Sequence, residues 1–130
     1  FPYTGKGLNI RDWLYVEDTC HAIDIVLHKG KVGEVYNIGG GNEKRNIEVV
    51  KKVIEIMGKK EDAIKFVPDR PGHDYRYSID YSKIINDLGW KPRIDFDTGI
   101  KMAINWYKEN EWWWRPLKER LKKSIKGFWT

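Results

Sequence analysis

The residues best suited to chemistry lie in the stretch VPDRPGHDYRYSID, residues 67–80, where two arginines and a histidine stand among prolines and a glycine. Proline fixes φ and removes a backbone donor, and Gly72 permits a turn, so we expect a shaped loop. The planar guanidinium of arginine recognises phosphate or carboxylate groups. Arg70, His73 and Arg76 therefore make this loop a candidate for binding an anion, although solvated charges on a surface loop explain the pattern equally well.

A second candidate is the glycine-rich segment GGGNEK, residues 39–44. Gly39 and Gly41 fit a G-x-G-x-x-G fingerprint, but Lys44 stands at its third position, and no G-x-x-x-x-G-K-[ST] motif occurs. The segment leads into a helix expected after Asn46, whose free N–H groups and positive dipole end would attract an anion. A plain turn between strand and helix is the alternative, and the sequence favours it somewhat.

Other kinds of site lack their parts. His21 and His28 are seven residues apart, which separates them by roughly 10 Å along a helix, too far to share a metal ion. None of the seven tyrosines is followed four residues later by lysine, as in the catalytic pair of short-chain dehydrogenases. Glu17 and Asp18 are typical of the acidic first turn of a helix.

The elements that would position these residues alternate between strands and helices. We expect strands at residues 10–16, 34–40 and 63–67, and helices at residues 17–28, 47–57, 81–88 and 98–111. The strands follow from β-branched and aromatic residues, and the helices from apolar residues at three- and four-residue spacing. This alternation indicates an α/β fold with a thin sheet of short strands.

Apolar spacing also predicts which helix faces are buried, and end signals predict where helices begin and end. We expect Asn46 to cap the helix at 47–57 and Gly89 to close the helix at 81–88. The spacing residues of the first helix are Val16, Cys20, Ile23 and Leu27. Those of the second are Ile47, Val50, Val53, Ile54 and Met57, and those of the helix at 98–111 are Ile100, Ala103, Ile104 and Tyr107.

Composition and charge limit the possible partners. With 41% apolar residues and seven tryptophans, the 130 residues should fold as one domain. The net charge of +5 comes entirely from residues 115–130, so the rest lacks the basic field of a nucleic-acid binder. No apolar run approaches the roughly 20 residues of a membrane span. One cysteine fits a reducing cytoplasm, and a first residue other than methionine indicates a piece of a longer protein.

The C-terminal residues 114–130 form a basic amphipathic tail. Its apolar positions are Trp114, Leu117, Leu121, Ile125 and Phe128, and they predict a helix at residues 117–126. A helix of this kind can bind an anionic membrane or nucleic acid. Because the rest of the chain is neutral, we expect its apolar stripe to pack on the protein itself.

Four segments of the chain together resemble one family: GKGLNIRDWLYVEDTCHAI, GEVYNIGGGNEKRN, DRPGHDYRYSID and LGWKP. In this order and at these separations, over residues 1–113, they resemble the C-terminal part of the dTDP-glucose 4,6-dehydratases, which are extended short-chain dehydrogenase/reductases. The pairing of RDWLYVED with DRPGHD is specific to these dehydratases, since related epimerases have a similar R-P-G-D pattern without the histidine.

The resemblance implies that residues 1–113 are the nucleotide-sugar substrate-binding portion of an α/β enzyme whose Rossmann domain is absent from this chain. The complete enzyme would be a cytoplasmic homodimeric lyase of deoxysugar biosynthesis, with neither a nucleic-acid nor a membrane partner. It would convert dTDP-glucose to dTDP-4-keto-6-deoxyglucose, with NAD oxidising C4 and returning hydride to C6 after water is lost. The family's cofactor fingerprint and catalytic residues lie upstream, so the fragment alone should be inactive.

The resemblance also implies which residues bind the substrate. The family positions that surround the nucleotide diphosphate correspond to Arg11, Asn46, Arg70 and His73. Two positions depart from the family pattern. Thr4 stands where the family has a tyrosine near the nucleotide base, which leaves base selectivity open, and Tyr75 replaces the first of two arginines in GHDRRY.

Two alternatives remain open at this point. Another nucleotide-sugar epimerase or decarboxylase would share much of the same binding surface. A free-standing module, which senses a nucleotide sugar or uses the basic tail on nucleic acid, would instead fold and act alone.

Overall fold

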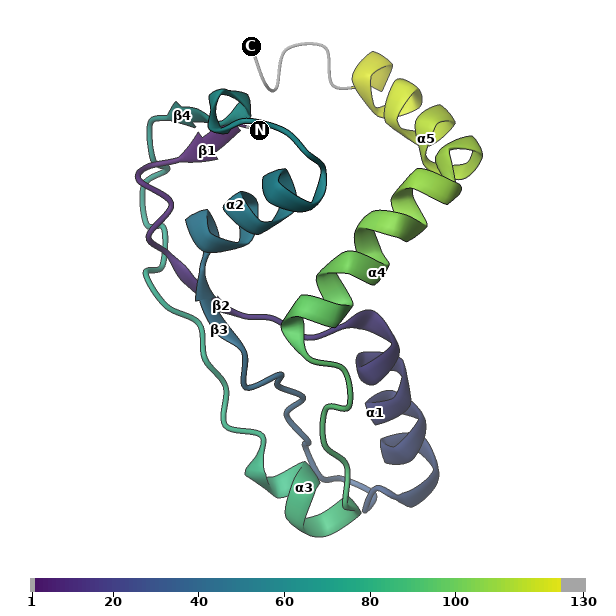
Figure 1. Ribbon diagram of the computed structural model, residues 1–130. Helices are drawn as coiled ribbons and strands as arrows, with labels where there is room; N and C mark the ends of the chain where they lie inside the picture. The colour runs from purple at the N-terminus through teal and green to yellow at the C-terminus, as the bar shows by residue number, and fades with distance from the viewer. Residues whose placement is uncertain (1, 125–130) are drawn as a thin grey trace. The chain divides into compact units, whose positions relative to one another are not determined.

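The computed structural model describes residues 2–124, which form helices and short strands (Figure 1). In chain order the elements are β1 (Pro2–Thr4), β2 (Ile10–Asp12), α1 (Val16–Lys29), β3 (Glu43–Arg45), α2 (Asn46–Ile56), the 3-10 turn η1 (Glu61–Ala63), β4 (Lys65–Val67), α3 (Ser82–Leu88), α4 (Phe96–Glu109) and α5 (Glu111–Ser124). They divide after Ile100 into two compact units.

Two small sheets organise the first unit. β1 pairs in parallel with β4, and β2 pairs antiparallel with β3 so that Arg11 lies opposite Lys44. The other edge of β2 binds the loop before α3, because Ile10 N donates to Tyr75 O at 2.7 Å and Tyr77 N donates to Ile10 O at 3.1 Å. β2 therefore has neighbours on both sides, one of which is the arginine- and histidine-bearing loop.

The main core of this unit lies where α1 meets α3. Ala22, Ile84 and Trp90 are buried there, with exposed fractions of 0%, 0% and 1%. Partly buried apolar residues pack around them: Leu14, Ile25, Val26, Tyr36, Ile38, Tyr81 and Leu88. The cluster packs α1, which follows β2, against α3, which follows the arginine- and histidine-bearing loop. It therefore holds the segments that flank β2 and this loop in place.

One carboxylate, that of Asp18 in the first turn of α1, is fully buried. It accepts hydrogen bonds from Ile94 N at 2.9 Å, from Arg93 N at 3.0 Å and from Arg93 Nε at 3.4 Å. Burial raises the pKa of Asp18, but these hydrogen bonds outweigh burial and leave the pKa below its ordinary value. Asp18 thus fastens the segment before α4 to α1, a role that its interpretation as an ordinary first-turn residue missed.

The predicted helices of the first unit are confirmed, with shifted ends. Gly89 closes α3 in the left-handed region, at φ 68°, and its N–H donates to Ile85 O. α4 begins two residues earlier than expected, because Asp95 accepts hydrogen bonds from both Thr98 N and Thr98 Oγ1. The predicted cap of α2 was wrong: Asn46 is its first helical residue and Arg45 is the N-cap.

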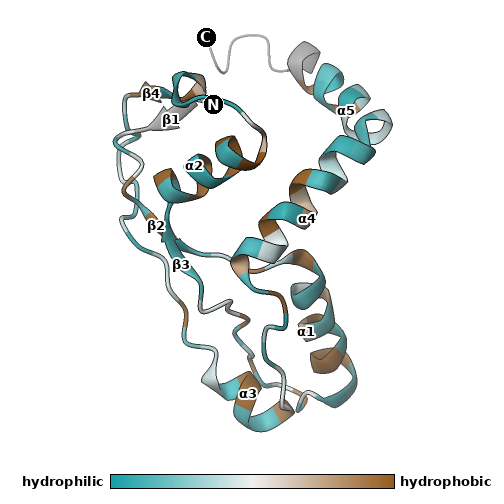
Figure 2. Ribbon diagram, in the orientation of Figure 1, coloured by the Kyte–Doolittle hydropathy of each residue, from teal (hydrophilic) through white to brown (hydrophobic). Residues whose placement is uncertain are grey.

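The predicted buried faces are only partly correct. α2 buries Ile54 as expected but also Val49, while Met57 is 41% exposed. α4 buries Ile104, whereas Tyr107 is 56% exposed. For α1, the apolar spacing predicted the helix correctly but not its buried side, which carries Asp18 and Ala22. Val16, Ile23 and Leu27 are exposed, and Figure 2 shows the apolar colour concentrated toward the C-terminal end of α1.

The strand predicted at residues 34–40 is not formed. The structure describes all of this segment, and the backbone N–H groups of residues 35–38 have no hydrogen-bond partner within the described residues. Tyr36 and Ile38 pack on the core, so the segment is held by side chains without a neighbouring strand to pair with. β1 and β3, which were not expected, exist because partners lie beside them. The strands predicted at 10–16 and 63–67 shorten to β2 and β4.

The second unit contains most of α4 and all of α5, and aromatic contacts hold its helices together. The Trp106 ring lies 5.5 Å from that of Trp113, and Trp114 Nε1 donates to Tyr107 O at 2.7 Å. α5 begins six residues before the predicted tail helix and passes through Pro116. Its apolar stripe is half exposed at Leu117 and Leu121.

The predicted packing of this stripe on the protein stays a prediction, and its last members, Ile125 and Phe128, lie outside the described residues. Within residues 2–124, no helix is both long enough and apolar enough to cross a membrane.

The buried carboxylate gives a direct test of this fold. We expect Asp18→Asn to lower the free energy of unfolding by about 1–3 kcal/mol, because an amide accepts fewer hydrogen bonds and turns a donor toward the N–H groups. Glu17→Gln, an exposed change in the same turn, controls for the helix dipole and should have little effect. Chemical denaturation measures both.

The pH dependence of the same variants checks the charge. Since the pKa of Asp18 is lowered in the folded state, its contribution is complete above the ordinary aspartate value of about 3.9 and is lost as pH falls toward the folded value. The stability difference between the original chain and Asp18→Asn should therefore shrink on acidification. A difference that is constant between pH 7 and pH 3 would contradict this.

Candidate functional site

Arg11 lies in β2 and its side chain is held against the loop before α3. Its Nη1 donates to Ile10 O at 2.6 Å, and its Nη2 donates to Asp74 O at 3.1 Å. The guanidinium carbon also lies 4.4 Å from the centre of the Tyr77 ring, a cation–π contact. Backbone pairing places Arg11, and these contacts fix the direction of its charge.

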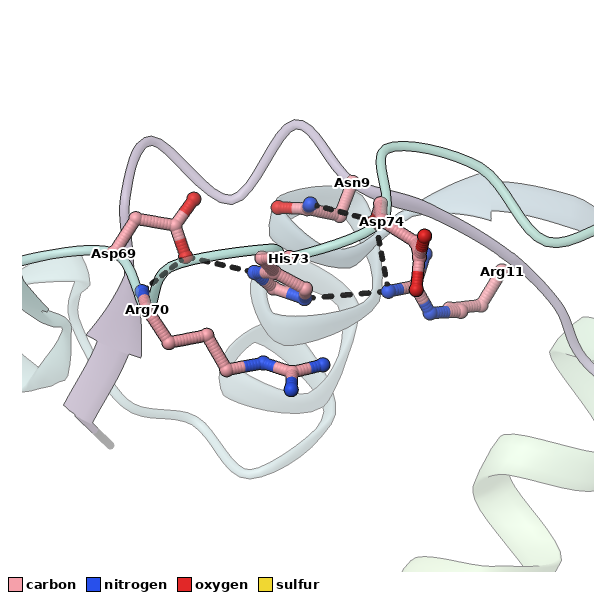
Figure 3. A network of polar contacts seen from close by, with 6 residues as sticks. All are labelled: Asn9, Arg11, Asp69, Arg70, His73 and Asp74. Atoms are coloured by element: carbon pink, nitrogen blue, oxygen red, sulfur yellow. Dashed lines mark hydrogen bonds and ion pairs between the residues drawn. The ribbon is translucent and has the colours of Figure 1, made fainter.

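His73 joins Arg11 to Asp69 (Figure 3). Its Nε2 lies 3.2 Å from Arg11 Nη2, and its Nδ1 lies 2.7 Å from Asp69 Oδ1. The imidazole side chain is 10% exposed, so it is among the more enclosed groups of this loop. Hydrogen bonding from His73, helped by Arg70 N, lowers the pKa of Asp69 below its ordinary value.

These contacts determine where the imidazole carries its proton. A guanidinium can only donate hydrogen bonds, so the Nε2 atom that faces Arg11 must be the acceptor. The proton then lies on Nδ1 and is donated to the carboxylate of Asp69. In this arrangement Arg11 supplies a positive charge beside the imidazole.

Arg70 is the cation that the loop leaves available. Its backbone N–H binds Asp69, but its guanidinium makes no hydrogen bond or ion pair with the described part of the chain. In Figure 3 the side chain extends alongside the His73 ring, in the direction of Arg11. The loop therefore presents an exposed guanidinium that extends in the direction of Arg11.

Asn46, the first residue of α2, reaches the same loop through one intermediary. Its backbone N–H donates to Asn9 O at 2.9 Å, and Asn9 Nδ2 donates to Asp74 O at 3.1 Å. Ile47 N donates to Gly7 O at 2.9 Å. The expectation of free N–H groups at this helix end was wrong, because the backbone N–H groups of both residues already have acceptors.

The glycine-rich turn is held by hydrogen bonds to a carboxylate of β2. The Asp12 carboxylate accepts hydrogen bonds from Gly40 N and Asn42 N, both at 2.7 Å. A Cβ atom added to Gly40 would lie 2.3 Å from Trp13 O, so the glycine is needed for close backbone approach. The turn thus serves to fasten β3 beside β2, which supports the plain-turn alternative.

Arg76, the third basic residue singled out in the loop, is not available to a ligand. Its Nε and Nη2 both donate to the carboxylate of Glu43 in β3. Their hydrogen bonding lowers the pKa of Glu43 and raises that of Arg76. This bidentate pair ties the loop to β3, across the width of β2.

A pocket of about 410 Å³ is lined in part by Tyr77. Its lining residues are Asp12, Leu14, Ile38, Gly39, Gly40, Tyr77, Ser78 and Ile79. The lining contains no basic residue, and its one carboxylate already binds two backbone N–H groups. This pocket is therefore unsuited to an anion, and the described residues also contain no cluster of three possible metal ligands.

The structure brings three of the four predicted site residues to one place. Arg11 and His73 are in contact, Arg70 extends beside them, and Asn46 is linked to them through Asn9 without direct contact in the described structure. Sequence reasoning missed Asp69, Asn9 and the ring of Tyr77. The two aspartates that flank R-P-G-H were a visible signal, since an acidic residue four positions before a histidine in a tight loop can reach its ring.

Comparison with known proteins shows the family to which this chain belongs. The chain matches the model of the GDP-mannose 4,6 dehydratase family over residues 1–103, and it belongs to that family. Within it, the relatives carry a narrower name. The chain is 47% identical over 127 residues to a probable dTDP-glucose 4,6-dehydratase of Sinorhizobium fredii, and 50% identical over 129 residues to dTDP-glucose 4,6-dehydratase of Escherichia coli.

Solved structures agree with this assignment. The dTDP-glucose 4,6-dehydratase of Bacillus anthracis, in complex with NAD, matches 89% of this chain at 53% identity and a TM-score of 0.83. That of Streptomyces venezuelae, with NAD and dTDP bound, matches 90% at 41% identity and 0.86. UDP-glucose 4-epimerase of Thermotoga maritima matches 84% at 29% identity and 0.78. The predicted resemblance to dTDP-glucose 4,6-dehydratases is confirmed.

The match covers only part of each relative. About nine tenths of this chain aligns, but it spans 36% of the curated relatives from Sinorhizobium fredii and Escherichia coli, and 37% of the solved Bacillus anthracis chain. The remaining two thirds or so of each of those proteins does not align with these 130 residues.

The close approach at Gly40 yields a test of how β2 and β3 are held together. We expect Gly40→Ala to lower the free energy of unfolding by about 3 kcal/mol, the upper end for overpacking, since the methyl group would meet a backbone carbonyl. Gly33→Ala is the control, because its Cβ meets nothing and only its positive φ costs about 1 kcal/mol. Equal losses for the two variants in a denaturation series would contradict the proposed packing.

Proposed function

We propose that this chain is the nucleotide-sugar-binding portion of a dTDP-glucose 4,6-dehydratase. In the complete enzyme, dTDP-glucose would be converted to dTDP-4-keto-6-deoxyglucose. The contact between Arg11 and His73, with the unpaired guanidinium of Arg70 beside it, is the observation that carries the proposal. The chain would bind the substrate's diphosphate, and the site residues would be Arg11, Asn46, Arg70 and His73.

The charges of the cluster suit this ligand. An esterified diphosphate carries two negative charges, and the two guanidinium groups of Arg11 and Arg70 match them in number. The carboxylate of Asp69, whose Oδ1 accepts hydrogen bonds from His73 Nδ1 and Arg70 N, offsets part of this positive charge. Within the described structure Arg11 still has its Nε–H and one Nη1–H without an acceptor, so it can bind phosphate without leaving the loop.

NAD would be bound elsewhere in the complete enzyme. The described residues do not fit it: the glycine turn has Lys44 in place of the third glycine, and Asp12 occupies its N–H groups. We assign the cofactor and the catalytic chemistry to the remaining two thirds of a protein of the relatives' length, which would act as a cytoplasmic homodimer. The exposed apolar face of α1 and the backbone N–H groups of residues 35–38, which have no acceptor within the described residues, offer that remainder a surface to pack on.

A nucleotide-sugar epimerase is the second candidate, favoured by the match to UDP-glucose 4-epimerase of Thermotoga maritima. The diphosphate cluster alone does not distinguish the two, because both substrates contain the same diphosphate. Comparing dTDP-glucose with UDP-glucose as ligands separates them.

We expect the 130-residue chain to bind dTDP-glucose weakly and NAD not at all, as measured by isothermal titration calorimetry. Binding of UDP-glucose with equal or greater affinity would favour the epimerase. Measurable binding of NAD would contradict the division of labour proposed above.

Arginine variants locate the binding in the cluster. Arg11→Ala and Arg70→Ala should each weaken dTDP-glucose binding by roughly 1.5–3 kcal/mol, the range for a charge-assisted hydrogen bond. Arg120→Ala removes the same charge from α5 and should leave the affinity unchanged. If Arg70→Ala bound as tightly as the original chain at moderate salt, the loop would have a purely structural role.

A further inference from the structure

The carboxylate of Asp69 occupies a space that the backbone of Gly5 leaves open. Gly5 has a φ of +61°, and a Cβ atom built on it would lie 2.8 Å from Asp69 Oδ2. Gly5 N donates to Val67 O at 2.9 Å, so the ends of β1 and β4 fix this approach. Asp69 is therefore held on one side by its neighbours in the fold and on the other by the imidazole.

Asp69, His73 and Arg11 form a chain of hydrogen bonds that ends at the proposed ligand. Asp69 accepts a hydrogen bond from Nδ1–H, and the lone pair of Nε2 points at the guanidinium of Arg11. A phosphate oxygen that approached Nε2 in this state would meet a lone pair, because a neutral imidazole with its proton on Nδ1 has no donor there. A proton on Nε2 removes that conflict and adds a second donor toward the ligand.

We propose that Asp69 positions His73 so that binding of a diphosphate draws a proton onto Nε2, which couples anion binding at this site to proton uptake. The inference rests on the proposed function. Solvent or buffer supplies the proton, and no bond between heavy atoms forms or breaks. Nδ1–H continues to donate a hydrogen bond to Asp69, and the new Nε2–H donates one to a phosphate oxygen. The guanidinium of Arg11 exchanges its hydrogen bond to Nε2 for one to the ligand.

The charged groups around His73 decide the direction of this coupling. Arg11 from β2 and Arg70 from the loop oppose a second positive charge on the ring, whereas Asp69 favours it. The carbonyl oxygen of Asp74 accepts a hydrogen bond from Arg11 Nη2, and its carboxylate accepts one from the Tyr77 hydroxyl. A bound diphosphate adds two negative charges, which tips the balance toward the imidazolium form.

Calorimetry with dTDP-glucose tests the coupling in the 130-residue chain. Both phosphates of this ligand are esterified, so the ligand itself does not titrate near neutral pH. Titrations at pH 6, 7 and 8, each in buffers of different ionisation enthalpy, measure the protons taken up. We expect up to about one proton per ligand near pH 7 and an affinity that falls as pH rises.

Variants separate positioning from simple structural support. Asp69→Ala should lower the affinity at pH 6 roughly tenfold and abolish the pH dependence. Asp69→Asn keeps an acceptor for Nδ1–H but not the charge, so it should restore part of the affinity with less proton uptake. His73→Gln should bind with no pH dependence. Asp62→Ala, an exposed change in η1, is the control for losing a carboxylate and should match the original chain.

A ligand-free readout tests the positioning by itself. The ¹⁵N resonances of the imidazole distinguish the two neutral forms, and His73 should carry its proton on Nδ1 in the original chain and in Asp69→Asn. In Asp69→Ala the ring should become a mixture of both forms. An unchanged spectrum in Asp69→Ala would overturn the role of Asp69, whether or not the chain binds a ligand.

The outcomes also separate this inference from the proposed function. Binding of dTDP-glucose without proton uptake, or proton uptake that survives Asp69→Ala, would overturn the inference and leave the function standing. No binding at any pH would overturn the function, and the coupling with it.

Discussion

The hydrogen bonds on the two edges of β2 are the constraint on which the rest of this structure depends. β2 has three residues, and it would not persist alone, but β3 pairs with one edge and residues 75–77 with the other. Arg11 is its middle residue, so its side chain is placed by two sets of backbone bonds. The Arg76–Glu43 pair then closes the loop over the strand, which brings His73 to the guanidinium.

The polar residues of this region divide into those that build it and those left for a ligand. Asp12, Asn9, Arg76 and Asp18 each bind a backbone group or an oppositely charged side chain, which fastens the neighbouring segments together. Arg70 remains open, and Arg11 keeps spare donors. Buried polar groups are costly unless they are paired, so the loop can form only when these residues have hydrogen-bond or ion-pair partners. The proposed function follows from Arg70 and Arg11, which keep donors available for a ligand.

The sequence predicted the helices well, because helical spacing is a local signal. Arginine chemistry is also local, and the anion-binding residues stay a prediction. The sequence predicted the strands poorly. Whether residues 34–40 or 43–45 become a strand depends on what lies beside them, which local sequence does not contain. The buried role of Asp18 is likewise invisible locally, since its partners come from beyond residue 90, whereas the interaction of Asp69 with His73 had a local signal in the four-residue spacing.

An NMR titration of the isotopically labelled chain with dTDP tests the central claim, that the loop and β2 together form a diphosphate site. The account predicts saturable shifts of the side-chain signals of Arg11, Asn46, Arg70 and His73, with smaller changes at the pocket lined by Ser78 and Ile79. Largest shifts at that pocket or along α5, with those four signals unmoved, would contradict it.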